Sequence, residues 1–481
     1  MSDERLLRLL PPELCDAEGE ALTVASPWRR EELARTPLST EEELESMLAT
    51  AATARDRRSW TPRPRRIAVL AEAAGRLEQR AEDFAWLIAA EGGKPLVDAR
   101  VEVRRAVEGL RLCAEAVRAA AGVEVPMSLS GDSAGRLAFT TREPIGVVLA
   151  VSAFNHPLNL IVHQVGPAIA AGCPTIVKPA PDTPLSCLAL VELLRSAGLP
   201  RAACQVATVD SIPLAERLAT DPRLNFLSFI GSSRVGWMLR AKLAPGVRCA
   251  LEHGGAAPVL VAADADLDDI TPRLVRGGFY HSGQVCVSVQ RVFAERSIAR
   301  ELAERLARQA AELIVGDPCL ESTAAGPLIR PGEVDRVEGW IKSAVAGGAE
   351  ALAGGARLSA TEVAPTVLWS PPVDSDVQQK EIFGPVVTVT PVEDLSEGVQ
   401  LANAVPFAFQ AAVCTRRLDT ALAAVRGLNA SAVMVNDHTA FRVDWMPFAG
   451  LNQSGLGVGG IEHTFRDMQI EKLCVLRSSA L

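Results

Sequence analysis

The sequence lacks any apolar run long enough to cross a membrane. Its longest apolar stretch, residues 146–154, is far shorter than the roughly 20 residues that a spanning helix needs. The N-terminal residues also lack the apolar core and cleavage site of a signal peptide. We therefore expect a soluble, cytoplasmic protein with no membrane partner.

Positive charge is not in excess either. Lysine and arginine number 49 against 58 aspartates and glutamates, which gives a formal net charge of −9 and a pI near 5.4. A surface with this balance does not attract polyanions. Nucleic acids are therefore not expected as partners.

Paired cysteines are missing as well. The chain has 10 cysteines, but none of them forms a C-x-x-C pair, so we predict no metal site. In a long cytosolic chain they should be reduced thiols, and most should be small buried hydrophobic residues. A cysteine with a chemical role must therefore be identified from its neighbours.

The G-x-G-x-x-G fingerprint of dinucleotide-binding folds is also absent. In its place, the segment from Gly231 to Gly236 follows an apolar strand predicted at 226–230 and opens a predicted helix. Such a junction directs free backbone N–H groups and the positive end of the helix dipole at an anion such as pyrophosphate. Two glycines at a tight turn also serve purely structural purposes, so this motif alone does not decide the function.

Regular alternation of helices and strands is what the chain does contain. At 481 residues it should form two or three domains. Apolar positions at helical spacing predict helices at 41–55, at 65–91 with a break near Gln79, and at 97–121. Segment 123–141 is predicted to be a hairpin or an extended arm.

Beyond this segment, short apolar strands alternate with helices. The predicted strands are 145–154, 174–178, 204–209, 226–230, 257–261 and 287–294. The predicted helices are 156–171, 185–197, 214–220, 266–281 and 298–314. This order indicates the α/β class with doubly wound parallel sheets. A last apolar strand at 471–477 has no obvious partner nearby.

Polar residues at the ends of predicted elements are candidates for chemistry. Asn155 follows one strand, Glu252 ends another, and Cys286 comes shortly after a helix. Ligands of open α/β sheets bind beyond the carboxyl ends of strands, so these residues are placed to supply an amide donor, a base and a nucleophile. Taken singly, such an Asn is usually a turn former and such a Glu is usually solvated.

Lys178 ends a further predicted strand in a chain with only six lysines. A charge there needs a partner, and the ribose hydroxyls of a cofactor would serve. The alternative is a lysine that reaches a surface loop.

In combination, these motifs resemble those of the aldehyde dehydrogenase superfamily. The chain carries L-E-x-G-G at 251–255, G-Q-x-C at 283–286, E-I-F-G-P at 381–385, and P-F-x-G with S-G-x-G within 447–457. The interval between Glu252 and Cys286 is 34 residues, as in the common hydrolytic members. The resemblance runs from about residue 40 to the C-terminus.

The resemblance implies the aldehyde dehydrogenase fold, which has two doubly wound α/β domains and a β-arm for oligomerisation. The NAD(P)-binding domain would comprise residues 1–122, 144–252 and 446–463, and the catalytic domain residues 253–445. The arm would comprise residues 123–143 and 464–481, and its open strand edge implies a homodimer or homotetramer.

The resemblance also implies NAD(P)-dependent oxidation of a small aldehyde to its carboxylic acid through a thioester on Cys286. A thiol needs help to ionise at neutral pH, and the nicotinamide charge and a helix N-terminus are the expected sources. The Asn155 amide and the Cys286 backbone N–H would hold the oxyanion. Glu252 would activate the water that releases the acid.

Cofactor contacts carry over in the same way. Lys178 would bind the adenosine ribose, and Glu381 the nicotinamide ribose with Phe383 packing nearby. The glycines and serine expected to approach the cofactor are Gly231, Ser232 and Gly255. Many NAD-preferring members have a glutamate three residues after the lysine, where this chain has Pro181 followed by Asp182. The choice between NAD and NADP stays open, with NAD slightly favoured.

Two further departures concern the site itself. Ala449 replaces a usual glycine, which is a small change. His253 follows the candidate base where leucine is usual; it either tunes that carboxylate or is a packing substitution.

For the substrate, the segments around Asn155, Lys178 and Arg442 look like the branch that acts on small anionic or hydroxylated aldehydes, such as lactaldehyde, phosphonoacetaldehyde and glyceraldehyde phosphate. An anion needs fixed cations, and the candidates are Arg105, His156 and Arg442. Each has an ordinary alternative: solvation for Arg105, capping of a helix for His156, and pairing with Asp444 for Arg442. The apolar neighbours of Cys286, Val285 and Val287, argue against a strongly charged tunnel.

Three other functions remain open. A CoA-acylating enzyme is disfavoured by Glu252, because a hydrolytic base would waste the thioester. A catalytically silent member kept for binding or structure is disfavoured by the joint presence of the three candidate catalytic residues. A cofactor-free cysteine hydrolase needs a histidine base, and only His281 lies near Cys286 in the sequence.

Overall fold

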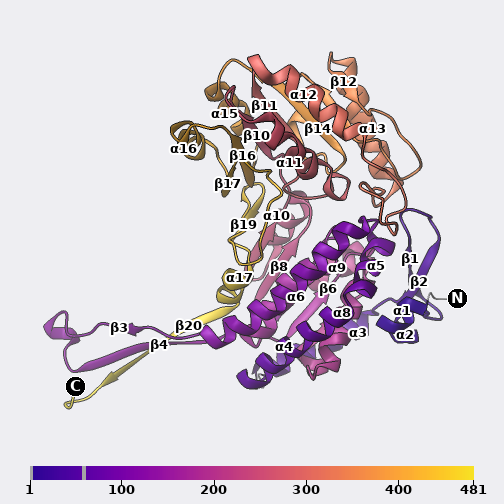
Figure 1. Cartoon of the computed structure of the whole chain (residues 1–481). Coiled ribbons are helices and arrows are strands. Elements are labelled where there is room, and N and C mark those ends of the chain that lie inside the picture. Colours follow the sequence, from indigo (N-terminus) through magenta and orange to yellow (C-terminus); the bar gives the residue numbers. More distant parts are fainter. Residues whose placement is uncertain (1–3, 57–60) are drawn as a thin grey trace.

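Two helix-covered sheets and a projecting β-arm make up the protein. The structure, a computed structural model, describes residues 4–56 and 61–481. In Figure 1 the two sheets form separate bodies, and the arm extends away from both of them. The α/β class and the parallel sheets predicted from the sequence are confirmed. Within the described residues, no helix is both long enough and apolar enough to cross a bilayer.

The first sheet has the strand order β19-β9-β8-β5-β6-β7. Its parallel strands are β5 (Val148–Val151), β6 (Thr175–Lys178), β7 (Cys204–Val206), β8 (Phe226–Ile230) and β9 (Arg248–Glu252), and β19 (Gly455–Leu456) pairs antiparallel with β9. From β5 the chain builds the sheet outward to β7 and then returns to the other side of β5 with β8. This reversal creates a crevice at the carboxyl ends of β5 and β8, where ligands of such sheets bind.

Helices cover both faces of this sheet. They are α3 (Glu41–Asp56), α4 (Arg63–Gln79), α5 (Ala81–Gly92), α6 (Leu96–Ala119), α7 (Asn159–Ala171), α8 (Leu185–Ser196), α9 (Ile212–Ala219), α10 (Ser233–Lys242) and α17 (Ile461–Asp467). The N-terminal elements α1 (Glu4–Leu9), α2 (Pro12–Cys15), β1 (Ala21–Ala25) and β2 (Glu32–Pro37) lie beside them. The predicted break near Gln79 is confirmed, because α4 ends there and α5 begins two residues later.

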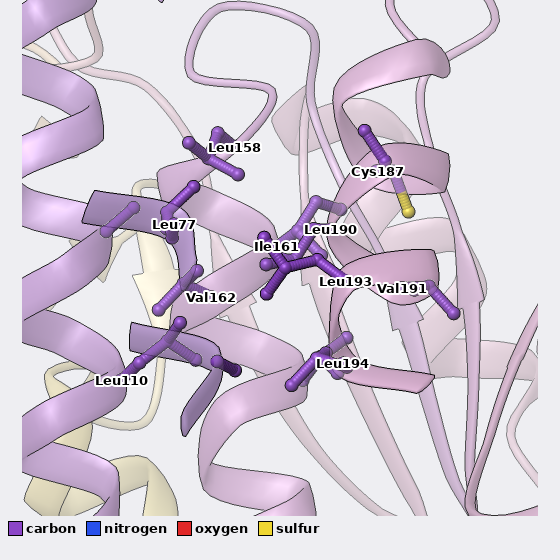
Figure 2. Close-up of a cluster of buried hydrophobic side chains, with 14 of the residues drawn as sticks. Leu77, Leu110, Leu158, Ile161, Val162, Cys187, Leu190, Val191, Leu193 and Leu194 are labelled. Atoms are coloured by element: carbon purple, nitrogen blue, oxygen red, sulfur yellow. The ribbon is translucent and has the colours of Figure 1, made fainter. Parts of the chain in front are cut away.

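A core of buried side chains joins the helices α4, α6, α7 and α8. Figure 2 shows its members Leu77, Leu110, Leu158, Ile161, Val162, Cys187, Leu190, Val191, Leu193 and Leu194. Truncating a buried leucine of this kind to alanine costs about 2–5 kcal/mol in other proteins. This packing holds α6 and α7 in place, and both helices lead to the crevice.

The second sheet has the order β12-β13-β14-β11-β10-β16-β17. Its strands are β10 (Pro258–Val261), β11 (Arg291–Glu295), β12 (Glu350–Ala353), β13 (Thr366–Trp369), β14 (Val386–Val392), β16 (Gln410–Cys414) and β17 (Ala432–Val435). All pair in parallel except β12, which is antiparallel to β13. The helices around it are α11 (Leu267–Phe279), α12 (Arg296–Ala311), α13 (Pro331–Ala346), α14 (Asp376–Gln379), α15 (Leu395–Asn403) and α16 (Leu418–Gly427).

The arm is a three-stranded antiparallel sheet. Strand β20 (Gln469–Arg477) pairs along its whole length with β4 (Arg136–Pro144), which also pairs with β3 (Glu124–Val125). The C-terminal strand therefore has a partner, but one more than 300 residues away along the chain. A small sheet of β15 (Phe407–Ala408) and β18 (Leu451–Asn452) lies near β19.

Several predicted boundaries were too generous. The apolar run at 145–154 forms a strand only over Val148–Val151, and the predicted strand at 287–294 begins only at Arg291. In both places apolar residues continue into buried loops at the crevice, where burial no longer signals a strand. The predicted division into domains stays a prediction.

Candidate active site

A cavity of about 530 Å³ opens at the carboxyl ends of β5, β6, β8 and β9, facing the second sheet. All the site residues predicted from the sequence line it except Gly255, namely Arg105, Asn155, His156, Lys178, Gly231, Ser232, Glu252, Cys286, Glu381, Phe383 and Arg442. Gly255 lies behind the wall, where an added Cβ would be 3.7 Å from the carbonyl oxygen of Cys286. Residues separated by hundreds of positions thus meet in one space.

Cys286 lies in an irregular loop between a short 3₁₀ turn (Tyr280–Gly283) and β11. Three consecutive residues of that turn, His281, Ser282 and Gly283, have positive φ values of 47°, 54° and 71°. A Cβ at Gly283 would overlap the carbonyl oxygen of Gly384, so this position requires glycine. We call residues 280–286 the nucleophile loop, after the candidate nucleophile at its end.

Hydrogen bonds hold the nucleophile loop in its unusual conformation. The Ser282 hydroxyl donates to the Gly326 carbonyl over 2.6 Å, and the Gln284 side chain accepts from the Ile329 N–H over 3.0 Å. No helix among the described residues begins at Cys286, so the expected help from a helix N-terminus is a wrong prediction. Helix α11 ends at Phe279, so the helix end next to this loop is a C-terminus.

The electrostatic surroundings of Cys286 favour the neutral thiol. Burial raises the pKa of this thiol well above its ordinary value, and the carboxyl groups of Glu252 and Glu381 raise it further, while Arg442 opposes them. Ionisation at neutral pH therefore needs an additional positive charge in the cavity.

Asn155 is buried just beyond the end of β5. Its side-chain Nδ2 donates a hydrogen bond of 2.8 Å to the carbonyl oxygen of Gln284 in the nucleophile loop. Because an amide nitrogen carries two hydrogens, one N–H remains to serve a ligand. The side chain is thereby oriented at the candidate nucleophile.

Glu252 ends β9 and faces the same cavity. Burial raises the pKa of this carboxyl, and Arg442 and Arg105 partly offset the rise. His253 also lines the cavity, but its Nδ1 bonds to the Gly231 carbonyl over 2.8 Å, and its ring packs against Phe229. Of the two alternatives for His253, the structure supports the packing substitution.

The same cavity also has groups that suit a dinucleotide. Ser232 stands at the N-cap of α10 with no side-chain cap bond, so the first N–H groups of this ten-residue helix can take a phosphate. Lys178 ends β6, and burial lowers the pKa of its amine to about 8 although the carboxylates of Asp210 and Asp182 favour the charged form. Asp182 in turn accepts two hydrogen bonds from Arg330 at the rim.

Glu381 gives an independent sign of a missing partner in this region. Its Oε1 is buried and has no hydrogen-bond partner, and burial raises the pKa of this carboxyl to about 8. A Cβ at Gly254 would overlap this oxygen, so glycine there makes room for the carboxyl group. Phe383 lies beside it and packs edge-on against Phe154. An unpaired buried carboxyl is costly unless a ligand hydroxyl completes it, so the residues fit a bound NAD(P).

The candidate substrate cations differ in how they are engaged. Arg105 donates to both carboxylate oxygens of Asp444, over 3.1 and 2.7 Å. Arg442 instead stacks on the Phe448 ring at 3.4 Å, and its buried Nε has no hydrogen-bond partner. The alternatives of a solvated Arg105 and of an Arg442–Asp444 pair are therefore both wrong, because Asp444 is turned to Arg105.

His156 is a wrong prediction as a fixed cation. Burial lowers the pKa of its ring well below the ordinary value, so it is neutral at pH 7. Its Nε2 instead lies 3.3 Å from the Tyr280 hydroxyl. It does not cap α7 either, since the N-cap residue is Leu158 and makes no side-chain cap bond.

Sequence reasoning missed His163 and Asn159 on α7. His163 Nε2 lies 2.7 Å from an Asp444 oxygen, and its Nδ1 lies 3.4 Å from an Arg442 nitrogen, so the ring links the two residues. Asn159 donates to the same carboxylate over 3.3 Å. The available signal was the spacing of Asn155, Asn159 and His163 by four residues, which places the last two on one helix face.

The comparisons with known proteins agree with this site. Residues 14–473 match the aldehyde dehydrogenase family, to which the chain therefore belongs. It is an NAD(P)-dependent aldehyde dehydrogenase.

Individual relatives cover almost the whole chain. The 3-sulfolactaldehyde dehydrogenase of Priestia megaterium is 36% identical over 96% of both chains, and the lactaldehyde dehydrogenase of Methanocaldococcus jannaschii is 32% identical over 95% of this chain and 97% of its own. Among solved structures, aldehyde dehydrogenase 21 from Physcomitrella patens in complex with the reaction product succinate has a TM-score of 0.93 at 34% identity, over 96% of both chains.

A glyceraldehyde-3-phosphate dehydrogenase from Methanocaldococcus jannaschii complexed with NADP has a TM-score of 0.91 at 31% identity, covering 96% of this chain and 100% of that one. These values confirm the predicted aldehyde dehydrogenase fold.

Proposed function

We propose that Cys286, Asn155 and Glu252 carry the oxidation of the aldehyde. The observation that carries this proposal is that Glu252 faces the cavity of Cys286, while the Asn155 amide is hydrogen-bonded to the loop of Cys286. Cys286 Sγ adds to the aldehyde carbon, and the free N–H of Asn155 and the backbone N–H of Cys286 donate to the resulting oxyanion. NAD(P), which Lys178, Ser232 and Glu381 would hold, would supply the acceptor for the hydride that leaves this carbon. The oxidised carbon stays on Sγ as a thioester.

Glu252 then takes a proton from the water that attacks the thioester and releases the acid. A Glu252→Gln variant tests this role, because it should complete one oxidation and stop as the acyl-enzyme. A burst of about one NAD(P)H per site without further turnover is expected, and Cys286→Ala should give no burst. Steady turnover by Glu252→Gln would remove Glu252 from the mechanism.

A CoA-acylating enzyme is the second candidate. It differs only in the release step, in which CoA instead of water would take the acyl group. A buried base beside the thioester favours water as the acceptor. Formation of free acid at an undiminished rate without CoA is the expected result, and strict dependence on CoA would reverse the assignment. Absence of NAD(P)H formation with a broad panel of aldehydes would instead favour a silent member.

We propose that the substrate is a small aldehyde with one negative charge or a hydroxyl group. The polar wall holds two cations, Arg105 and Arg442, and one anion, Asp444, while burial lowers the pKa of His163 to about 4 and so keeps it neutral. Because Asp444 pairs with Arg105, Arg442 makes no ion pair among the described residues and its buried Nε has no hydrogen-bond partner, although the Glu252 carboxyl acts on its charge. The names of the relatives, 3-sulfolactaldehyde and lactaldehyde dehydrogenase, are consistent with this class.

For the cofactor, we propose a modest preference for NAD over NADP. Two carboxylates, Asp182 and Asp210, act on Lys178, where the adenosine ribose is expected. They would repel the 2′-phosphate of NADP, although Arg330 neutralises Asp182 in part. The ratio of kcat/KM for the two cofactors tests this, and Asp210→Asn should move it towards NADP.

We propose a homodimer or homotetramer in the cytoplasm, and the arm favours the assembly. Strand β20 is at the edge of its sheet and exposes Leu473 and Val475 to 54% and 48%. An exposed apolar strand edge is stabilised by pairing with a second copy. We retain the three-part division into residues 1–122, 144–252 and 446–463, residues 253–445, and the arm. No disulfide links cysteines within the described residues, which suits a reducing compartment.

A further inference from the structure

One face of helix α6 carries three charged residues, and each of them bonds to a different segment of the active site. Asp98, Glu102 and Arg105 are spaced by four and three residues, so they lie along one side of the helix. Asp98 and Glu102 are fully buried. The chemical steps proposed for Cys286, Asn155 and Glu252 use none of these three residues directly.

Asp98 supports the nucleophile loop. Its Oδ2 accepts a hydrogen bond from the N–H of His281 over 3.3 Å, and its Oδ1 accepts from Arg276 over 2.5 Å. His281 is the first of the three residues with positive φ that precede Cys286. Side-chain-bearing residues rarely adopt this conformation, so the surrounding contacts must hold it.

Glu102 supports the segment that carries Asn155. Its Oε1 accepts from the N–H groups of Leu158 and Asn159, over 2.9 and 3.0 Å. These are the N-cap and first residue of α7, three and four positions after Asn155. The other oxygen of Glu102 pairs with Lys94, which is also fully buried.

Arg105 supports the loop that carries Arg442. It binds both oxygens of Asp444, which lies two residues after Arg442. Arg442 makes no ion pair of its own among the described residues, so its position depends on the neighbouring loop, on its contact with His163 and on its stacking with Phe448.

We propose that Asp98, Glu102 and Arg105 are positioning residues, which set the nucleophile, the oxyanion donor and the substrate cation relative to one another before the aldehyde binds. Helix α6 can do this because it is 24 residues long and packs through its apolar face into the core of Figure 2. Three loops that are bonded to one rigid helix keep a fixed geometry relative to one another. This inference rests on the proposed roles of Cys286, Asn155 and Arg442.

Each positioning residue should have its own kinetic signature. Asp98→Ala should lower kcat by roughly 10- to 100-fold, since small displacements of reacting groups have effects of this size. It should also slow the alkylation of Cys286 by iodoacetamide, with KM for NAD(P) little changed. Asp98→Asn keeps an oxygen for the His281 N–H and should recover most of both rates, which also covers the case that the alanine variant fails to fold.

Glu102→Gln also keeps an acceptor oxygen but loses its charge. It should lower kcat by a smaller factor while the alkylation rate of Cys286 stays at the wild-type value. Arg105→Met should raise KM for an anionic aldehyde by a clearly larger factor than KM for a neutral aldehyde such as propanal. Arg104→Ala removes a charge from the exposed side of the same helix and is the matched control, expected to behave as wild type.

Variants that lose only thermal stability, with kcat, KM and alkylation rate per folded molecule equal to wild type, would overturn the inference. The inference would also be overturned if all three variants changed the same kinetic constant by the same factor. Failure of the underlying mechanism is distinguishable from this, because Cys286→Ala would then retain aldehyde oxidation.

Discussion

The side-chain amide of Asn155 donates a hydrogen bond of 2.8 Å to the main-chain carbonyl of Gln284, two residues before Cys286. This bond joins the end of a strand in the first sheet to a loop that leads into the second sheet. It fixes the plane of the amide, so the second N–H has one direction in which to donate.

Removal of this amide should impair the chemical step. Asn155→Ala is expected to lower kcat by ~10²–10³, the usual effect of losing one oxyanion donor. KM for NAD(P) should change little, because the removed amide bonds to the Gln284 carbonyl and not to a residue proposed to hold the cofactor. Single-turnover measurement of NAD(P)H formation checks the prediction. A variant within threefold of wild type would argue against an oxyanion role.

The release of the acid should depend on pH through Glu252. A general base acts in its deprotonated form, and burial raises the pKa of this carboxyl above the ordinary value of 4.5. Under conditions in which release limits turnover, kcat should therefore rise with pH through this raised pKa. Hydrolysis of the thioester in Glu252→Gln should lack this rise. Parallel profiles in both proteins would assign the titration to another group.

Stability should depend on pH through His163. Burial lowers the pKa of this ring from 6.5 to about 4, so the folded state favours the neutral form. The corresponding stability is present above pH 6.5 and is lost as the pH falls from 6.5 towards 4, because the unfolded chain takes up the proton first. Between pH 7 and 5, the Tm of wild type should fall by a few degrees more than that of His163→Gln. His463→Gln, at a partly exposed histidine, should follow wild type.

Arg442 should bind the negative charge of an anionic substrate. Arg442→Ala should raise KM for an anionic aldehyde by roughly 10- to 100-fold, the range expected for a lost charged hydrogen bond. The effect on a neutral aldehyde should be much smaller. Arg426→Ala, which removes an exposed arginine at the end of α16, serves as the control. Equal losses for charged and neutral aldehydes would mean that Arg442 acts on the site as a whole.

The nucleophile loop should not tolerate a side chain at Gly283. Its φ of 71° and the overlap of an added Cβ with the Gly384 carbonyl both oppose alanine. Gly283→Ala should lower the free energy of unfolding by more than about 1–2 kcal/mol and also reduce the alkylation rate of Cys286. Gly339→Ala, in the middle of α13 with open space around it, should be neutral or stabilising. Denaturant unfolding of both variants makes the comparison.

The features that could be predicted are those that the local sequence determines. Alternating apolar strands and helices gave the α/β class, and the motifs around Glu252 and Cys286 gave the candidate reactive groups, because each lies at the end of an element that its own sequence defines. The ion pair of Arg105 with Asp444 could not be predicted, because the two residues are 339 positions apart and each has several other possible partners. The left-handed backbone conformation of His281 and Ser282 could not be predicted either, because tertiary contacts impose it and the residue types do not.

The pairing of β20 with β4 has a consequence for how the molecule is completed. The partner strand of β4 is translated more than 300 residues after β4 itself. During translation, one edge of β4 therefore stays uncovered while both large sheets are being produced. A chain halted before residue 469 would keep this edge bare, ready to associate with other unfinished copies.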